Sequence, residues 1–461
     1  MSLVNDLLDI KRGFYEGGKL RGGNNDFHNA NAPFEDQASP DRDVMRARAR
    51  WLHENNGIIS GIDSSIKANA IGAGMKFQSK SGDEKLDASI EKYFNEWCSQ
   101  KNCDITGRLC FGDMQNLILG QRMMDGEILI YPKLMTDKKH PLKIQLIEAD
   151  RFEGAMFTNA NTKDGTTYID GMEVNTYGKP QKYVLRDGLF NQVRINADDA
   201  IHYFKMTNRA TQYRGISEYK QIIIDLRNFA GYNTATIQSL RARASVAYAV
   251  ETNNVSGHMA ALGKTQNNDP IFDINGVMVH YLNSGEKMVQ LDPTINGAEY
   301  KDFMQTCIRL IAVGRQISYE LAFRDYSQVN FSSARASLIQ DHKRFSTEQA
   351  HLANYVLNPL FEKWLDVMVL SGNIKGISSD YYFKNKETVC QPRWIAPARE
   401  WVDPLKDINA FKEEYALGIG TLREYAAQRG KDLEEILAQR EKENEMLKKA
   451  GIIPQEGAKS A

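Results

Sequence analysis

Residues 257–265 contain the residue types that bind nucleotide phosphates. The segment reads GHMAALGKT and ends in Gly-Lys-Thr, whose lysine and hydroxyl groups hold phosphate and Mg²⁺ in P-loop proteins. A P-loop has four residues between its first glycine and the Gly-Lys-Thr, and here His258 stands where that glycine is required. We therefore interpret the segment as a polar loop. A nucleotide hydrolase remains the enzymatic alternative, and nucleotide turnover that Lys264→Ala removes would support it.

Two carboxylates and three cysteines are the other candidates for catalysis or metal binding. Asp125 and Glu127 flank a glycine, and if Glu127 opens a strand both carboxylates point to one face, as acid–base chemistry would need. A turn of this sequence before a strand is also common without chemistry, and we favour that interpretation. Cys98, Cys103 and Cys110 have no histidine near them in the sequence to complete a zinc site. We predict no catalytic residue, no metal and no cofactor.

The charge of the chain limits how it can bind nucleic acid. Lys and Arg number 58 against 59 Asp and Glu, a formal charge of −1, which argues against a dedicated nucleic-acid binder with a uniformly basic surface. Residues 214–249 carry a net charge of +3 and residues 251–293 a net charge of −3. Segregated charge of this kind suits a surface over which DNA slides without sticking, because phosphate affinity grows with each neutralised contact.

Three arginines alternate near the start of the chain. Arg46, Arg48 and Arg50 would line one face of a strand, whereas a helix would scatter them. They could hold phosphates or pair with acids of a neighbouring subunit.

The elements that must position these groups form an α+β body and a long rod. Residues 1–40 are rich in Gly, Asn and Asp and predict a flexible arm, with order beginning near Asp41. Helical patterns up to about residue 125 give way to short β-like runs separated by Asp-Gly turns. Residues 216–250 then predict one helix of roughly 50 Å.

The rod carries more apolar residues than a small β-module could cover, so we expect a neighbouring copy to pack on it. These residues are Ile222, Ile223, Ile224, Leu226, Phe229, Ile237, Leu240, Val246 and Tyr248.

A β-module and a returning helix follow the rod. Asn275-Gly276 between strand-like runs predicts a two-residue hairpin, with a third strand in KMVQL at 287–291. The returning helix is expected from about residue 299 to 316. The loop RDYSQVNFSSAR, residues 324–335, comes next, and Ser332 or Ser333 should cap a helix that runs to about residue 357.

The C-terminal part predicts short capped helices. Asp403-Pro404 is a helix start, Thr421 with Glu424 is a capping box, and Asp432 with Glu435 could cap the last helix. The N-terminus lacks the order of a signal peptide, and no apolar run approaches the roughly 18 residues of a membrane span. We therefore expect a protein of a reducing compartment, without a membrane partner.

Several separated blocks of the sequence carry a resemblance. They are RARARWLHENNGIISGIDSSIKANAIGAGMKFQ, RATQYRGISEY, NGVMVHYLNSGEKMVQLDP, ISYELAFRDYSQVNFSSARASL and the C-terminal WIAPAREWVDPLKDINAFKEEYALGIGTLREYAAQRGKDLEEIL. Together they resemble lambda-type tailed-phage portal proteins. The resemblance covers roughly residues 41–440 in consistent order. Blocks in order are more specific than any single motif. A shorter ring adaptor of the head–tail junction is the structural alternative, and it would lack the helix, β-module, helix order.

The resemblance implies a ring, usually of twelve subunits, at one vertex of a capsid. It implies a portal fold with an α/β wing, a long-helix stem, a small β-containing clip and a helical crown. The implied division is 1–40 arm, 41–213 wing, 214–250 first stem helix, 251–294 clip, 295–317 second stem helix, 318–332 tunnel loop, 333–402 wing helix and return strands, 403–450 crown and 451–461 flexible tail.

The resemblance also implies function and partners. DNA would be packaged through the channel by the large subunit of a terminase, which hydrolyses ATP itself, and later ejected. Implied partners are further copies of this chain, non-specific double-stranded DNA, the major capsid and scaffold proteins and a head–tail adaptor, in a virion assembled in the host cytoplasm. The candidate site residues are Arg324, Asp325, Gln328 and Asn330 in the tunnel loop, Arg241 and Arg243 in the stem, and Lys264 and Lys287 in the clip.

Overall fold

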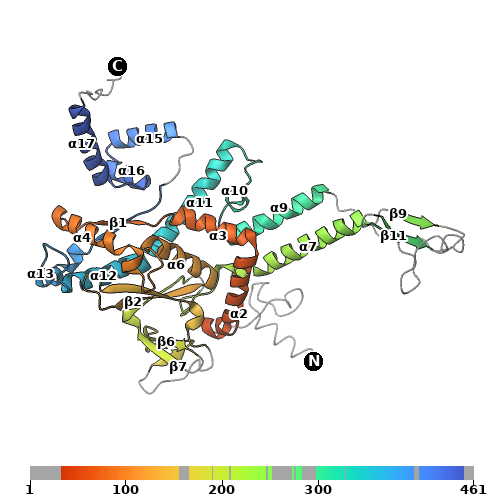
Figure 1. The fold of residues 1–461 in the computed structure, drawn as a ribbon, viewed down its shortest axis with the longest axis horizontal. Helices are drawn as coiled ribbons and strands as arrows, with labels where there is room; N and C mark the ends of the chain where they lie inside the picture. The colour runs from red at the N-terminus through yellow and green to blue at the C-terminus, as the bar shows by residue number, and fades with distance from the viewer. Residues whose placement is uncertain are drawn as a thin grey trace, which may run out of the picture.

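The chain folds into a mixed helical and sheet body from which a helix pair extends to a small sheet (Figure 1). The computed structural model describes most of the chain. The described ranges are 33–154, 166–188, 191–206, 209–245, 248–251, 272–274, 277–282, 297–327, 329–398 and 404–450.

Helix α2 (Phe34–Asn55) corrects the expected arm boundary, because residues 34–40 belong to the helix and order begins before Asp41. These residues are held by tertiary contacts: the Glu35 carboxylate is buried and accepts hydrogen bonds from the backbone N–H groups of Tyr213 at 2.6 Å and Arg214 at 3.1 Å. Residues 1–32 of the expected arm lie outside the described residues. A break at Asn56, whose side chain caps the next helix, separates α2 from α3 (Gly57–Ala70).

The centre of the body is an antiparallel sheet of order β3-β2-β8, formed by β2 (Glu127–Leu134), β3 (Leu142–Ile147) and β8 (Ile201–Phe204). Helices α4 (Glu84–Trp97), α6 (Phe111–Asp125) and α12 (Asn358–Leu370) contribute buried residues to the core beside it. Aromatic rings fill this core, with ring centroids of Phe94 and Trp364 4.9 Å apart, edge to face.

A second antiparallel sheet of order β4-β5-β6-β7 has its own small core. Its strands are β4 (Thr167–Ile169), β5 (Met172–Val174), β6 (Pro180–Asp187) and β7 (Asn191–Asn196). Met172 and Leu185 pack there with Phe152. The Asp-Gly turns at 170–171 and 187–188 place glycine in the left-handed region, as a hairpin turn requires.

Helices α7 (Ile223–Ser245) and α9 (Gly297–Gly314) form the extended helix pair (Figure 1). The Tyr232 and Phe303 rings join them with centroids 4.2 Å apart. The prediction of one helix over residues 214–250 or 216–250 is wrong, because α7 is shorter at both ends. A 3₁₀ turn at Glu218–Gln221 precedes α7, and residues 248–250 belong to strand β9 (Tyr248–Glu251) because they pair with another strand.

The apolar residues of α7 are also used differently from the expectation. Ile222, Ile223, Leu226 and Phe229 are buried within the chain itself, so they need no neighbouring copy. Ile224, Ile237 and Leu240 are about half exposed. The side chains of Val246 and Tyr248 lie outside the described part.

The small sheet at the far end of the helix pair has the order β10-β11-β9. β10 (Phe272–Ile274) and β11 (Val277–Leu282) are antiparallel with Ile274 opposite Val277, so the predicted hairpin is confirmed. β9 pairs parallel with β11 as the third strand. The expected strand at 287–291 lies outside the described residues.

Helix α11 (Phe331–Leu352) continues through a π turn at Ala353–Leu357 into α12. The expected end near residue 357 is therefore wrong, because the π turn keeps the helix continuous. At its start, Asn330 caps α11 through a 2.8 Å hydrogen bond from the Ser333 N–H to its side chain, in place of Ser332 or Ser333. Short helix α10 (Tyr319–Phe323) lies just before the loop that leads to Asn330 and α11.

The C-terminal helices are α15 (Pro404–Ala416), α16 (Leu422–Gln428) and α17 (Leu433–Lys449). The capping box of Thr421 and Glu424 is confirmed. Asp432 caps α17 by accepting a hydrogen bond from the Glu434 N–H, and the expected partner Glu435 takes no part in this cap. The Asp432 carboxylate also accepts a hydrogen bond from Gln78. Gln78 belongs to β1 (Lys76–Ser79), which pairs with β12 (Pro392–Ile395). Asp403 lies outside the described residues.

Among the described residues no helix combines the length and apolar character needed to cross a bilayer.

Candidate functional site

Glu218 joins four elements where the helix pair meets the body. Its carboxylate accepts hydrogen bonds from Arg122 of α6, from Arg315 at 2.8 Å and from Arg344 of α11 at 3.0 Å. Glu218 stands five residues before α7, and Arg315 directly follows α9. One carboxylate thus ties the start of one long helix and the end of the other to the body.

Two further carboxylates complete this cluster, which we call the junction cluster: Glu218, Asp63, Glu348 and the cations that contact them. Arg315 donates to Asp63 at 2.7 Å, and Arg122 donates to Glu348 at 2.7 Å. Burial alone would raise the pKa of Glu218, but the surrounding guanidinium groups hold that pKa well below its usual range. The carboxylates are therefore ionised and act as structural links.

The two ends of the helix pair touch each other at the same place. A Cβ built on Gly314 would lie 2.3 Å from Cγ2 of Ile222, so only glycine allows this approach. The pair consequently leaves and re-enters the body at one point.

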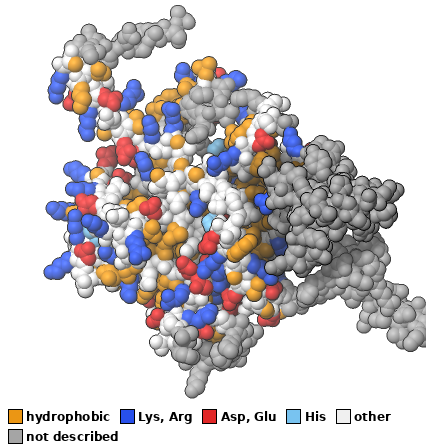
Figure 2. All heavy atoms as spheres, turned by 45° about the vertical axis from the view of Figure 1, so that its right-hand side comes forward, with side chains coloured by type: hydrophobic (Ala, Val, Ile, Leu, Met, Phe, Trp, Pro, Cys, Tyr) orange, Lys and Arg blue, Asp and Glu red, His pale blue; other side chains and the backbone are white. Residues whose placement is uncertain are grey.

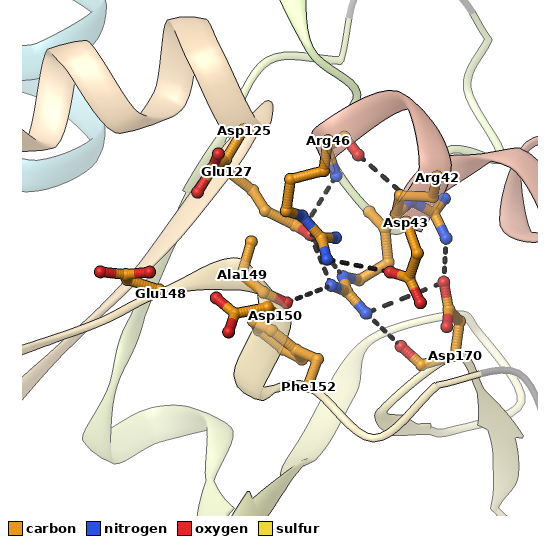
Figure 3. A network of polar contacts seen from close by, with 12 residues as sticks. Arg42, Asp43, Arg46, Asp125, Glu127, Glu148, Ala149, Asp150, Phe152 and Asp170 are labelled. Carbon is orange, nitrogen blue, oxygen red and sulfur yellow. Dashed lines mark hydrogen bonds and ion pairs between the residues drawn. The ribbon is translucent and has the colours of Figure 1, made fainter. Parts of the chain in front are cut away.

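A second buried network lies between α2, β2 and the sheet β4-β5-β6-β7 (Figure 3). Glu127 is fully buried and accepts hydrogen bonds from the Arg214 Nε at 2.8 Å and the Gly215 N–H at 2.9 Å. His202 contacts the same carboxylate at 2.9 Å, and Figure 3 shows Arg46 directed toward it. Burial opposes ionisation, yet the Arg214 guanidinium lowers the pKa of Glu127 well below its ordinary value.

This network resolves the roles of the alternating arginines and of the Asp125–Glu127 pair. Arg50 binds Asp125 through two hydrogen bonds of 2.9 and 2.6 Å, and Arg46 binds Asp43 of its own helix. Two of the three arginines therefore pair with acids of their own chain, whereas Arg48 is exposed. Both carboxylates are held by arginines, which the sequence did not indicate, and Glu127 opens strand β2 after the turn at Gly126, as expected.

Acidification should destabilise the fold in two stages. His351 has its pKa lowered to about 4 by burial and by nearby Lys205 and Arg122, so below about 6.5 the unfolded chain takes a proton that the fold excludes. Glu218 and Asp63 have lowered pKa values, so their contribution is present above their ordinary values of 4.5 and 3.8 and is lost as the pH falls through the folded-state values. We expect the thermal midpoint to fall from pH 6.5 downward. His351→Gln should flatten only the upper stage; an unchanged slope would contradict the assignment.

The loop between α10 and α11 holds the expected DNA-facing residues, and the described ones are partly engaged. Arg324 is exposed, has φ 56° and donates to Ser65 Oγ at 3.4 Å. Asp325 accepts from the Ser327 N–H at 3.0 Å, and hydrogen bonding by the Ser327 side chain and backbone lowers the pKa of its carboxyl. Asn330 is exposed but serves as the cap of α11. Gln328 lies outside the described residues.

The other expected contact residues lie on or beyond the helix pair. Arg241 is exposed on α7. The side chain of Arg243 and the whole of Lys264 and Lys287 lie outside the described part, as does the Gly-Lys-Thr segment.

Sequence reasoning missed the junction cluster. Arg315 and Asp63 are separated by 252 residues and Arg122 and Glu348 by 226. No local spacing signals such pairs; the only available sign is a charged residue near the start of the predicted long helix, Glu218, and one at the end of the predicted returning helix, Arg315.

The cysteines at 98, 103 and 110 show no metal-binding arrangement. Cys110 caps α6 in a capping box with Asp113. Burial raises the pKa of Cys103 to about 12, so its thiol stays protonated. Among the described residues no group of three or more potential ligands comes together.

Comparison with known proteins identifies relatives of one kind. The family model described as phage portal protein, lambda family, matches residues 21–349, more than half of the chain. A "Probable portal protein" of Halomonas phage phiHAP-1 is 23% identical over 434 residues, covering 89% of this chain and 82% of the relative. The portal protein of Escherichia phage N15 is 22% identical over 494 residues, covering 96% and 91%. Portal protein B of Escherichia phage lambda is 29% identical over 195 residues, covering 41% and 36%.

Solved structures with a similar chain come from gene transfer agent particles. A chain from the neck of the empty particle, computed with C6 symmetry, gives a TM-score of 0.45 at 11% identity and covers 87% of this chain and 96% of that chain. A chain from the neck of the native particle, computed with C12 symmetry, gives a TM-score of 0.42 at 12% identity and covers 86% and 99%.

Proposed function

This chain belongs to the lambda family of phage portal proteins, and we propose from that membership that its copies form a ring-shaped channel at one vertex of a tailed-phage capsid. DNA passes through the channel during packaging and ejection, and the ring joins head to tail. The family match carries the proposal, because residues 21–349 include the sheets β3-β2-β8 and β4-β5-β6-β7, the helix pair and the loop before α11.

In the proposed ring, each part of the fold corresponds to a named part of a portal subunit. The body with both sheets is the wing, the helix pair α7–α9 is the stem, and the sheet β9–β11 is the clip. Residues 318–332, which include α10, are the tunnel loop, and the C-terminal helices are the crown. The exposed apolar side chains on the stem support side-by-side packing of neighbouring copies, because a closed ring repeats one interface at every subunit.

The ring can be tested by native mass spectrometry and negative-stain images of the purified protein. A ring of roughly twelve copies of the 52.2 kDa chain has a mass of about 630 kDa. A stable 52.2 kDa monomer at micromolar concentration across salt conditions would contradict the proposal.

The protein acts in this proposal as a channel and not as an enzyme. The terminase large subunit supplies ATP hydrolysis, while the capsid and scaffold proteins and a head–tail adaptor contact the ring from outside. Lack of the P-loop glycine at His258 supports this division of work.

Changing the tunnel loop should impair packaging without preventing assembly. We expect replacement of residues 325–329 by Gly and Ser, with Asn330 kept, to give intact rings that package or retain less DNA. Asn330 is kept because its loss removes the α11 cap, which costs about 1 kcal/mol. Asn330→Ala alone should lower stability with little effect on packaging. If the loop replacement yields only monomers, the loop is an interface element.

DNA binding by the free ring should be weak, sequence-independent and sensitive to salt. The net charge is −1, and Figure 2 shows lysine, arginine and acidic side chains interspersed on the described surface. Non-specific binding of this kind has dissociation constants of roughly 10⁻⁴–10⁻⁶ M at physiological salt. Fluorescence anisotropy with two unrelated duplexes tests this; tight binding to only one of them would contradict it.

A further inference from the structure

A cavity of about 710 Å³ lies beside the junction cluster. Its walls come from β8, α11 and the two body-proximal ends of the helix pair. The volume falls within the roughly 300–1,000 Å³ of small-molecule sites in proteins. Nothing in the channel function uses it.

The lining of this cavity is cationic. It contains five basic side chains and one carboxylate, Glu218, while Asp63 and Glu348 pair with the lining arginines from behind. Counting all three carboxylates, the positive charges exceed the negative ones by two. The basic residues are Arg122, Lys205, Lys220, Arg315 and Arg344.

Three of the lining arginines have unused hydrogen-bond donors. The Nε atoms of Arg122, Arg315 and Arg344 have no hydrogen-bond partner, although Arg122 and Arg315 are each only 1% exposed. A buried N–H without an acceptor is costly, so such groups usually meet a water or a ligand. The three Nε atoms are themselves buried, so they add to the positive charge beside the cavity.

Two other lining residues, Lys205 and His351, have pKa values that burial and neighbouring cations lower. Burial and the nearby Arg122 lower the pKa of Lys205 to about 8. Burial, Lys205 and Arg122 lower the pKa of His351 to about 4. Both groups are pushed toward their neutral forms mainly by burial, and the neighbouring cations add to this effect.

We propose that this cavity binds a phosphate dianion, free or as the terminal group of a small nucleotide. The two negative charges of the phosphate match the excess of two positive charges in the lining, whereas a carboxylate carries only one. Guanidinium groups also match the geometry of phosphate oxygens. The aromatic rings of Phe204 and Tyr355 also line the cavity and leave an apolar wall for a base. A bound phosphate would bridge β8, α9 and α11, and so would stiffen the joint between the helix pair and the body.

Isothermal titration of the full chain with inorganic phosphate, at ionic strength held constant with chloride, tests the site. Lys205→Gln removes one cation, and Thr347→Glu places a carboxylate on an exposed lining position of α11. We expect each to weaken phosphate binding about tenfold or more, the effect of losing one charge-assisted hydrogen bond. Lys133→Gln, on the exposed end of β2, makes the same charge change outside the cavity and should bind normally.

The thermal midpoint gives a second readout, because a ligand that binds only the folded state raises it. Phosphate should raise the midpoint of the wild type and of Lys133→Gln more than chloride does. Equal affinity for dAMP and phosphate assigns the site to phosphate alone, and tighter dAMP binding assigns it to a nucleotide. No binding, equal binding by Thr347→Glu and wild type, or a response only to duplex DNA would overturn the proposal. Thr347→Glu decides if Lys205→Gln does not fold.

Discussion

Glu127→Ala should lower the free energy of unfolding by about 3–5 kcal/mol, the usual cost of removing one partner from a buried ion pair. The substitution leaves the Arg214 guanidinium, which is 2% exposed, without its carboxylate. It also leaves the Gly215 N–H without its acceptor. The effect should spread, because Glu127 connects β2 with α2 and with the segment that leads into the helix pair. The midpoint of urea denaturation measures it.

Glu148→Ala is the matched control for this substitution. Glu148 is also a carboxylate beside an arginine, with Arg50 at 3.1 Å, but its side chain is 53% exposed. Solvent screens such a pair, so its loss should cost about 1 kcal/mol or less. Equal denaturation midpoints for the two variants would show that burial of the Glu127 pair has no special weight.

Leu310→Asp combined with Val313→Asp should abolish the ring while leaving the subunit folded. The two side chains are 57% and 72% exposed on α9 and lie three residues apart, on one face of the helix. Their exposure means that the isolated chain gains little from them. In the proposed ring each would be buried, which contributes about 1.5–3 kcal/mol per side chain, and a buried unpaired aspartate adds a further penalty. The defect repeats at every interface.

Size-exclusion chromatography with light scattering measures the assembly state, and circular dichroism checks the fold. Leu370→Asp makes the same chemical change at a 64% exposed position at the end of α12, away from the helix pair, and should leave rings intact. Rings from the double variant would place the subunit interface elsewhere.

The elements with local signals were predictable, and those that depend on distant partners were not. The hairpin at Asn275-Gly276 and the capping box at Thr421 follow from neighbouring residues. The sequence predicts helix for residues 248–250, because nothing in the local sequence indicates that they pair with β11, about thirty residues away. Likewise, three polar residues compete to cap α11, and only the backbone path selects Asn330 over the two serines.

The same limit applies to the site. The loop before α11 was located from its composition, but the roles of Arg324 and Asn330 within the chain depend on Ser65 and on the geometry of the turn. The junction cluster has no sequence signature, since its members come from α3, α6, α7, α9 and α11 regions of the chain.

Contact between Ile222 and Gly314 makes the helix pair and its sheet a modular insertion. The ninety or so residues between them leave the body at one point and return at the same point, so a short linker could replace them without stretching the chain. In evolutionary terms, such a module can lengthen, shorten or be exchanged between relatives while the body stays the same. In engineering terms, residues 222 and 314 are the natural splice points for a subunit without the helix pair or with a helix pair of altered length.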